Sequence, residues 1–261
     1  MPGSEIVESE KEINGSGKRV WGPWATIGLG LVVFIVSVIV QVVIIVIFII
    51  AELVNETESG LAELEFFNWL DMGNLGLLIS LSVIISSVVC IGLIMIFIKL
   101  RRGDTVTGYL GLKSISFKVV LVSLAVSAGF IALEVLANRV FQVSAESDIM
   151  TKAYDTSILP ALFWIALIAF GPIFEEVMFR GFLFKGLRHS RIGVAGAIIV
   201  TSVLWAGSHL QYGLFQIAWI FVLGVALGLM RYRTGSLWAP ILMHIFNNLI
   251  AVLFIALEVG F

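Results

Sequence analysis

Charged residues are scarce in this chain of 261 residues. They make up 13% of the sequence, whereas soluble domains contain about 25%. Hydrophobic residues make up 59%, and the mean hydropathy is +1.07. This composition excludes a water-soluble globular particle, because too few polar side chains exist to cover its surface. The net charge of −2 provides no basic surface, so we expect no nucleic-acid partner.

Cysteine and histidine are also rare. The single cysteine, Cys90, lies inside an apolar run, which excludes an intramolecular disulfide and a metal site built from cysteines. The chain has three histidines. His189 lies in a basic turn and is interpreted as a surface residue, whereas His209 and His244 interrupt apolar segments.

Long apolar segments are abundant. A helix needs roughly 20 mostly apolar residues to cross the hydrocarbon layer of a membrane. The segments that qualify, or nearly so, are 23–51, 74–98, 118–137, 158–184, 193–210, 214–230 and 237–258. The sequence therefore predicts an all-α, polytopic integral membrane protein with about seven transmembrane helices. We expect one transmembrane domain over residues 21–261, after a flexible cytoplasmic tail over residues 1–20 that is rich in Glu, Ser and Gly.

The basic residues occur in alternate loops. All of the 16 Lys and Arg residues except Arg139, Lys152 and Arg180 lie in the N-terminal tail or near the loops at 99–118, 185–191 and 231–233. Basic loops remain on the cytoplasmic side of a membrane. The pattern predicts a multi-pass protein of the cell membrane, with the N-terminus in the cytoplasm and the C-terminus outside.

Two adjacent glutamates occur in the fourth apolar segment. Ionisable residues are costly within membrane helices and indicate function. Arg180 follows Glu176 by four residues, so the two side chains can form an ion pair on one helix face. Glu175 is rotated by ~100° and is left to face another direction. The two acids thereby acquire different roles: Glu176 is neutralised by Arg180, and Glu175 is the reactive carboxylate. A salt-bridged helix end at the cytoplasmic surface is the alternative interpretation.

Two further polar pairs follow at helical spacing. Trp205 precedes His209 by four residues, and His244 precedes Asn248 by four. Counting depth at about 1.5 Å per residue places His209 near the outer end of its segment and His244 towards the cytoplasmic side. The two histidines can meet if the fifth segment starts below the membrane surface or tilts strongly; otherwise the segment boundaries given above are wrong.

These residues form three motifs in order along the chain. They read Glu175-Glu176-Val-Met-Phe-Arg180, Trp205-Ala-Gly-Ser-His209 and His244-Ile-Phe-Asn-Asn248. Over about residues 158–252 the sequence resembles the CAAX protease and bacteriocin-processing family of intramembrane peptidases, also called the Abi family. Trp205 stands where that family usually has Phe. The resemblance implies an intramembrane protease that hydrolyses peptide bonds of a membrane-associated protein or peptide in the lipid bilayer.

The motifs suggest a division of labour for peptide hydrolysis. We expect Glu175 to be the general base that activates a water molecule, with His209 orienting that water. Two donors on one helix face, His244 and Asn248, would stabilise the oxyanion. Glu176 and Arg180 would support these residues.

A zinc mechanism is the competing version. Glu175, His209 and His244 would then be the ligands of a catalytic metal, which lowers the pKa of its bound water to about 7. We prefer a mechanism without a cofactor, because the sequence has no His-x-x-x-His or His-Glu-x-x-His pair to organise a metal.

Two alternatives from other functional classes stay open. A non-catalytic immunity or scaffold protein would have the same fold. A proton-coupled transporter would use the glutamates and histidines as a proton relay. The presence of every motif residue favours the peptidase.

Overall fold

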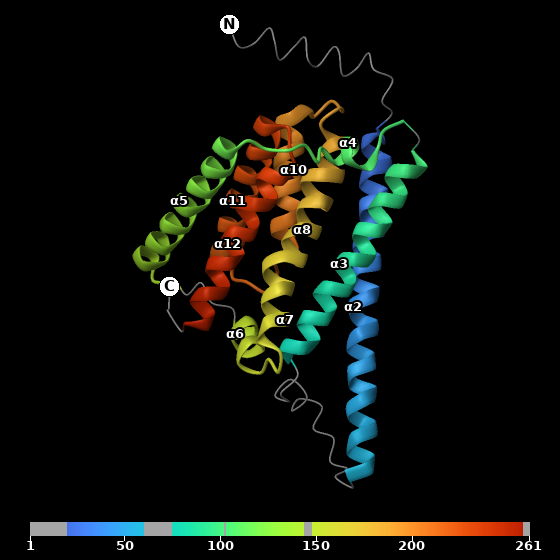
Figure 1. The fold of residues 1–261 in the computed structure, drawn as a ribbon, viewed down its shortest axis with the longest axis vertical. Coiled ribbons are helices and arrows are strands. Elements are labelled where there is room, and N and C mark those ends of the chain that lie inside the picture. Colours follow the sequence, from blue (N-terminus) through green and yellow to red (C-terminus); the bar gives the residue numbers. More distant parts are fainter. Residues whose placement is uncertain (1–19, 60–74, 102, 144–147, 258–261) are drawn as a thin grey trace, which may run out of the picture.

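A computed structural model describes residues 20–59, 75–101, 103–143 and 148–257, and this part of the chain is built from helices (Figure 1). The tail expected over residues 1–20 lies outside it, apart from its last residue. The helices, in order, are α2 (Pro23–Ser59), α3 (Leu75–Leu100), α4 (Val106–Leu110), α5 (Phe117–Phe141), α6 (Asp148–Asp155), α7 (Pro160–Ile165), η2 (Ala166–Phe170), α8 (Gly171–Glu176), η3 (Val177–Leu183), α9 (Phe184–Leu187), α10 (Gly193–Gly207), α11 (Leu214–Thr234) and α12 (Trp238–Ala256).

The structure confirms the polytopic α-helical class. Within the described residues, six helical segments are long and apolar enough to cross a membrane, and each coincides with one of the predicted segments. The predicted segment 193–210 is also helical, but its helix α10 has only 15 residues. At about 1.5 Å per residue such a helix is roughly 22 Å long, which is less than the ~30 Å of a hydrocarbon layer.

The basic loops lie together at one end of the molecule. The start of α2, the end of α3, the α9–α10 turn and the α11–α12 turn are all at the top of Figure 1. The alternation of basic loops therefore corresponds to the direction in which successive helices run. That this end faces the cytoplasm stays a prediction.

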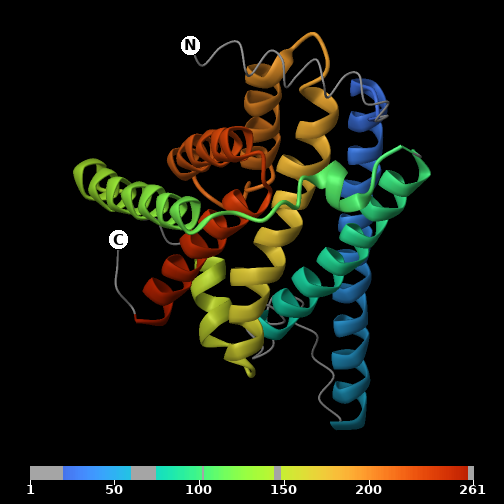
Figure 2. The ribbon, with the colours of Figure 1, turned by 45° about the horizontal axis from the view of Figure 1, so that its top comes forward.

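A continuous helix with two π-helical stretches forms the centre of the bundle. Residues Pro160–Leu187 make one span that contains two wide π-helical stretches, η2 and η3, on either side of α8. The span contacts α2, α3, α10, α11 and α12, and Figure 2 shows it between α5 on one side and the α2–α3 pair on the other. Its polar residues therefore meet other helices instead of lipid.

Pro172 explains why one carbonyl oxygen of this span has no backbone hydrogen-bond donor. The backbone N–H of Gly171 donates to the carbonyl oxygen of Ala166, five residues earlier, as in a π-helix. Pro172 comes next and has no N–H. The next carbonyl in that pattern, at Leu167, therefore lacks the backbone donor that another residue would supply.

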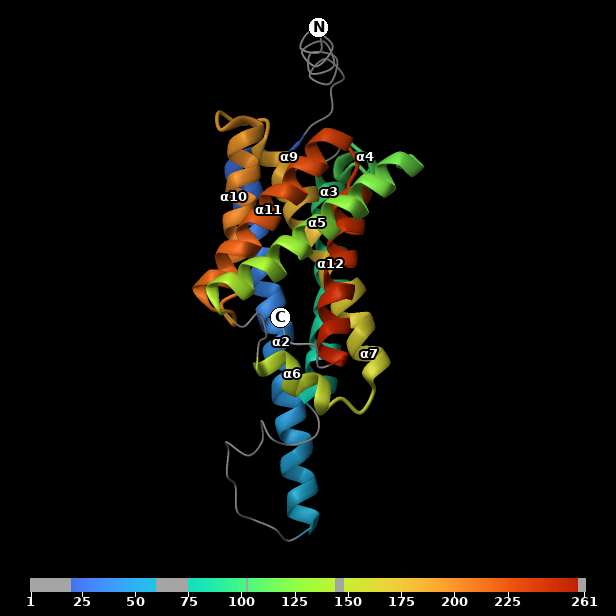
Figure 3. The ribbon, with the colours of Figure 1, turned by 90° about the vertical axis from the view of Figure 1, so that its left-hand side faces the viewer.

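The helix α12 is held from two sides. Ser127 on α5 donates its hydroxyl to the carbonyl oxygen of Met243 at 3.1 Å, where α5 crosses α12 (Figure 3). At the start of α12, the backbone N–H of Leu237 donates to the carbonyl oxygen of Gly111 at 2.9 Å. These contacts set the depth of His244 in the bundle.

Candidate active site

The structure brings all the predicted site residues into one region, where three elements meet. The central span supplies the glutamates and the arginine, the loop after α10 supplies one histidine, and α12 supplies the other histidine and the asparagine. They are Glu175, Glu176, Arg180, His209, His244 and Asn248.

A buried network surrounds Glu176. Nη1 of Arg180 donates to Oε1 of Glu176 at 2.7 Å, and both side chains are 0% exposed. Nδ1 of His244 lies 3.0 Å from the same oxygen, and Nη2 of Arg180 donates to the carbonyl oxygen of Gly224 at 3.1 Å. Charges away from water are stable only when paired and hydrogen-bonded, so Glu176 and Arg180 brace each other as the i, i+4 spacing predicted.

Trp205 is the residue that the sequence reasoning undervalued. Its indole N–H donates to Oε2 of Glu175, and the guanidinium of Arg180 lies 4.5 Å above its ring. The rings of His209 and His244 meet it edge-on, with centroids at 5.2 Å and 5.1 Å. The sequence showed that Trp205 and His209 share a helix face, but phenylalanine, the usual residue of the family, has no N–H to offer Glu175.

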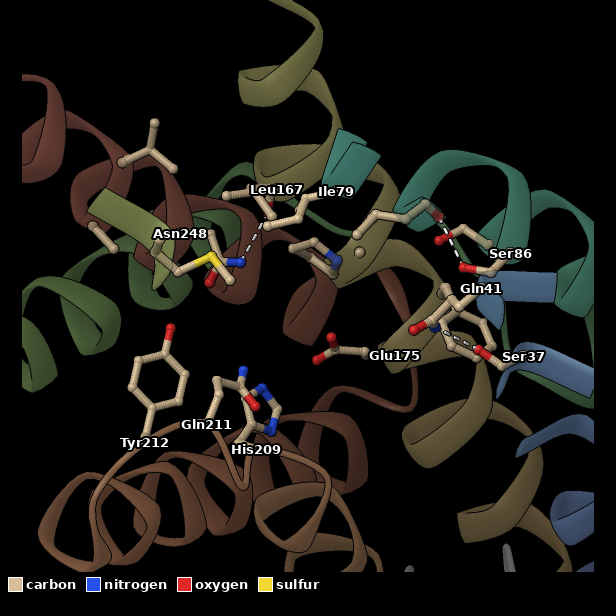
Figure 4. A pocket seen from close by; sticks show the side chains of 18 of the residues that line it. Ser37, Gln41, Ile79, Ser86, Leu167, Glu175, His209, Gln211, Tyr212 and Asn248 are labelled. Carbon is tan, nitrogen blue, oxygen red and sulfur yellow. Dashed lines mark hydrogen bonds between the residues drawn. The ribbon is translucent and has the colours of Figure 1, made fainter. Parts of the chain in front are cut away.

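Glu175 is the acid that reaches open space. Its side chain is 26% exposed, and it lines a cavity of about 300 Å³. Figure 4 shows its carboxylate between Asn248, Tyr212 and His209 on one side and the polar side chains of α2 and α3 on the other. The two adjacent carboxylates therefore have the separate environments that the sequence predicted.

His209 lies in the loop after α10 and lines the same cavity. Its Nδ1–H donates to the carbonyl oxygen of Trp205 at 2.8 Å, which leaves Nε2 as an acceptor in the neutral ring. The depth conflict that the sequence raised is resolved here. Because α10 ends at Gly207 after 15 residues, the loop begins before the full depth of a span, and His209 and His244 both reach Trp205.

His244 is buried beside the two glutamates and is not among the residues that line the cavity. Its Nδ1 contacts Glu176, and its Nε2 lies 3.8 Å from Oε2 of Glu175, beyond hydrogen-bond length. The ring therefore contacts Glu176 directly and lies next to Glu175 without a hydrogen bond to it.

Asn248 lines the cavity and also forms a hydrogen bond with the π-helical stretch η2 of the central span. Its Nδ2 donates to the carbonyl oxygen of Leu167 at 2.9 Å, the carbonyl that Pro172 leaves without a backbone donor. An amide nitrogen carries two N–H donors. One is used for this helix contact, and the other is available to a bound molecule.

The zinc version requires Glu175, His209 and His244 to converge. Within the described ranges, no three His, Cys, Asp or Glu side chains are grouped so that they could hold a metal ion. The ring of His244 instead has its Nδ1 at Glu176. These residues do not form a ready metal site.

The fold and the site define a polytopic membrane protein in which a carboxylate, Glu175, and a histidine, His209, line a cavity within the helical bundle. Comparison with known families agrees with this class: the family described as "Type II CAAX prenyl endopeptidase Rce1-like" matches residues 157–250. Residues 157–250 are therefore similar to a family of CAAX proteases, in agreement with the three motifs.

One curated relative shows how far the similarity extends. The "Uncharacterized 24.3 kDa protein" of Escherichia coli is 31% identical over 124 residues. The alignment covers 46% of this chain and 56% of the relative, so the chain spans about half the length of that relative. No solved structure matches the chain.

Proposed function

We propose that the protein is an intramembrane endopeptidase in which Glu175 activates a water molecule to hydrolyse a peptide bond of a membrane-associated protein or peptide. The observation that carries this proposal is the separation of the two glutamates. Glu176 is buried and paired with Arg180, whereas Glu175 faces the cavity. A general base must reach the water that it deprotonates, and Glu175 is the carboxylate in this position.

The proposed reaction begins when Glu175 takes a proton from the water. At the same time the water oxygen attacks the carbonyl carbon of the scissile peptide bond. His209 orients the water through its Nε2. The second N–H of Asn248 donates to the oxyanion of the tetrahedral intermediate. Glu175 then gives its proton to the leaving nitrogen as the C–N bond breaks. His244, expected from the sequence to be a second oxyanion donor, has its Nδ1 3.0 Å from Oε1 of Glu176, and its role as a donor stays a prediction.

The test is cleavage of membrane-anchored peptides by purified wild-type protein in detergent, with Glu175→Ala as the comparison. Mass spectrometry of the products identifies the bond that is cut. Cleavage by the wild type alone supports the proposal. Equal product formation by both proteins would contradict the enzymatic interpretation and favour a non-catalytic protein of the same fold.

Removal of metal addresses the competing zinc version. We expect the wild-type protein to keep its rate after treatment with a chelator, because Glu175 acts directly on water in the proposed mechanism. Metal content and peptide cleavage are measured on the same sample. Loss of cleavage that zinc restores would contradict this expectation, since a catalytic zinc would supply the activated water.

Replacing Trp205 by phenylalanine tests how Glu175 is held. Trp205→Phe keeps one aromatic ring beside His209, His244 and Arg180, and it removes the indole N–H together with the second ring. A hydrogen bond to a charged group contributes about 1.5–3 kcal/mol, so we expect kcat to fall by roughly 10- to 100-fold. Trp238→Phe is the matched control, because Trp238 is exposed at the start of α12. Wild-type kcat in Trp205→Phe would show that the bond does not position Glu175.

A further inference from the structure

The proposed oxyanion site has one assigned donor, and its geometry leaves room for another. Asn248 already uses one N–H on Leu167, and His244 lies outside the cavity lining. Stabilisation of a tetrahedral intermediate depends on donors aimed at the place where negative charge develops. The residues that line the cavity can supply a further donor.

Tyr212 is such a residue, although no motif includes it. It lies in the loop between α10 and α11 and lines the cavity together with Glu175, His209 and Asn248. Figure 4 shows its hydroxyl pointing into the cavity, on the side where Asn248 lies. The side chain therefore faces the carboxylate that activates the water from across the same space.

The position of Tyr212 is fixed by two contacts with His209. Its backbone N–H donates to the carbonyl oxygen of His209 at 3.1 Å. Its ring stacks on the imidazole, with the centroids 6.3 Å apart and an angle of 28° between the planes. The loop thus presents His209 and Tyr212 as a unit, one carrying the ring that orients water and the other carrying a hydroxyl.

The hydroxyl of Tyr212 is available as a donor. The part of the chain that the structure describes provides no hydrogen-bond partner for it, and it opens onto the cavity. Burial raises the pKa of Tyr212 above its ordinary value, and the nearby charge of Glu175 raises it further. The phenol therefore keeps its proton at neutral pH and can donate it in a hydrogen bond.

We propose that the Tyr212 hydroxyl is a catalytic hydrogen-bond donor to the carbonyl oxygen of the scissile peptide bond, opposite the attacking water and beside the amide of Asn248. The assignment rests on the proposed peptidase function. The hydrogen bond strengthens as the carbonyl oxygen becomes an oxyanion, so it lowers the barrier more than it strengthens substrate binding. Tyr212 neither gains nor loses a proton in this step.

The variant Tyr212→Phe tests the assignment, because it keeps the ring that stacks on His209 and removes only the hydroxyl. Removal of one oxyanion donor typically lowers kcat by about 10²–10³-fold, and we expect a loss of this order with KM nearly unchanged. The matched control is Tyr232→Phe, which removes a phenol hydroxyl near the end of α11 and should leave both constants unchanged. Thermal unfolding of each variant in detergent is measured alongside.

A rescue experiment separates the hydroxyl from the fold. Incorporation of 4-aminophenylalanine in place of Tyr212 keeps both the ring and a donor, and we expect it to recover much of the lost kcat. A wild-type kcat in Tyr212→Phe would overturn the proposal and leave the ring as a support for His209. A rise in KM at constant kcat would also overturn it, because the hydroxyl would then bind the ground state. The peptidase function itself fails only if wild type and Glu175→Ala are equal.

Discussion

Replacing Glu175 by glutamine is expected to lower kcat for peptide cleavage by about 10²–10⁴-fold, which is the usual contribution of a general base. Glutamine has the shape of glutamate and still offers a carbonyl oxygen to the indole N–H of Trp205, but it cannot accept a proton from water. The loss should therefore appear in kcat, while KM and the melting temperature stay close to those of the wild type. Steady-state kinetics and thermal unfolding in detergent measure these quantities.

The control for this experiment is Asp155→Asn, which makes the same change from acid to amide at an exposed position at the end of α6. We expect Asp155→Asn to cleave at the wild-type rate, because Asp155 does not line the cavity. A fully active Glu175→Gln would contradict the water-activation mechanism and also the zinc version, since both require the carboxylate.

Replacing Arg180 by methionine is expected to destabilise the fold by about 3–5 kcal/mol, the usual cost of removing one partner of a buried ion pair. Both Arg180 and Glu176 are 0% exposed, so the variant would leave a carboxylate buried without its counter-charge. The contact between the guanidinium and Trp205 would also be lost. Unfolding of the detergent-solubilised protein measures the change, and Arg191→Met, at an exposed position in the α9–α10 turn, is the control.

A second variant tests whether the cost comes from the unpaired charge. In the double variant Glu176→Gln with Arg180→Met, no buried charge is left alone, and the glutamine oxygen can still accept from His244. We expect the double variant to be more stable than Arg180→Met alone, because charges in contact are energetically coupled. Equal or lower stability of the double variant would show that packing of Arg180, not its charge, supports the fold.

The sequence predicted which polar residues meet, because the residues that interrupt apolar helices must face one another or a cavity. The ion pair of Glu176 with Arg180 followed from helical spacing, and the structure confirms it. The separate surroundings of Glu175 followed from its rotation by one residue along the helix. These predictions depend on local geometry and on the cost of charge in an apolar layer, both of which can be derived from the chain.

Other features depend on contacts between distant segments and were not visible. The segment 193–210 is apolar to its end, so its hydropathy did not indicate that α10 ends at Gly207. Gly207 and Ser208 mark the position where the helix stops. The hydrogen bond from Asn248 to Leu167 could not be predicted, because it depends on a carbonyl of a neighbouring helix that Pro172 leaves without a backbone donor. Tyr212 resembles any loop tyrosine, and only its stacking on His209 and its place in the cavity distinguish it.

The wide turns η2 and η3 have a consequence for comparing this chain with its relatives. A π-helical turn holds more residues than an α-helical turn, so each behaves as a small insertion within the helix. Inside Pro160–Leu187, the residues on either side of Ala166–Phe170 or Val177–Leu183 therefore need not stay in phase with those of a relative whose helix is regular. Single-residue gaps are expected within these two stretches, and the regular turn of α8 between them, Gly171–Glu176, is the natural anchor for an alignment.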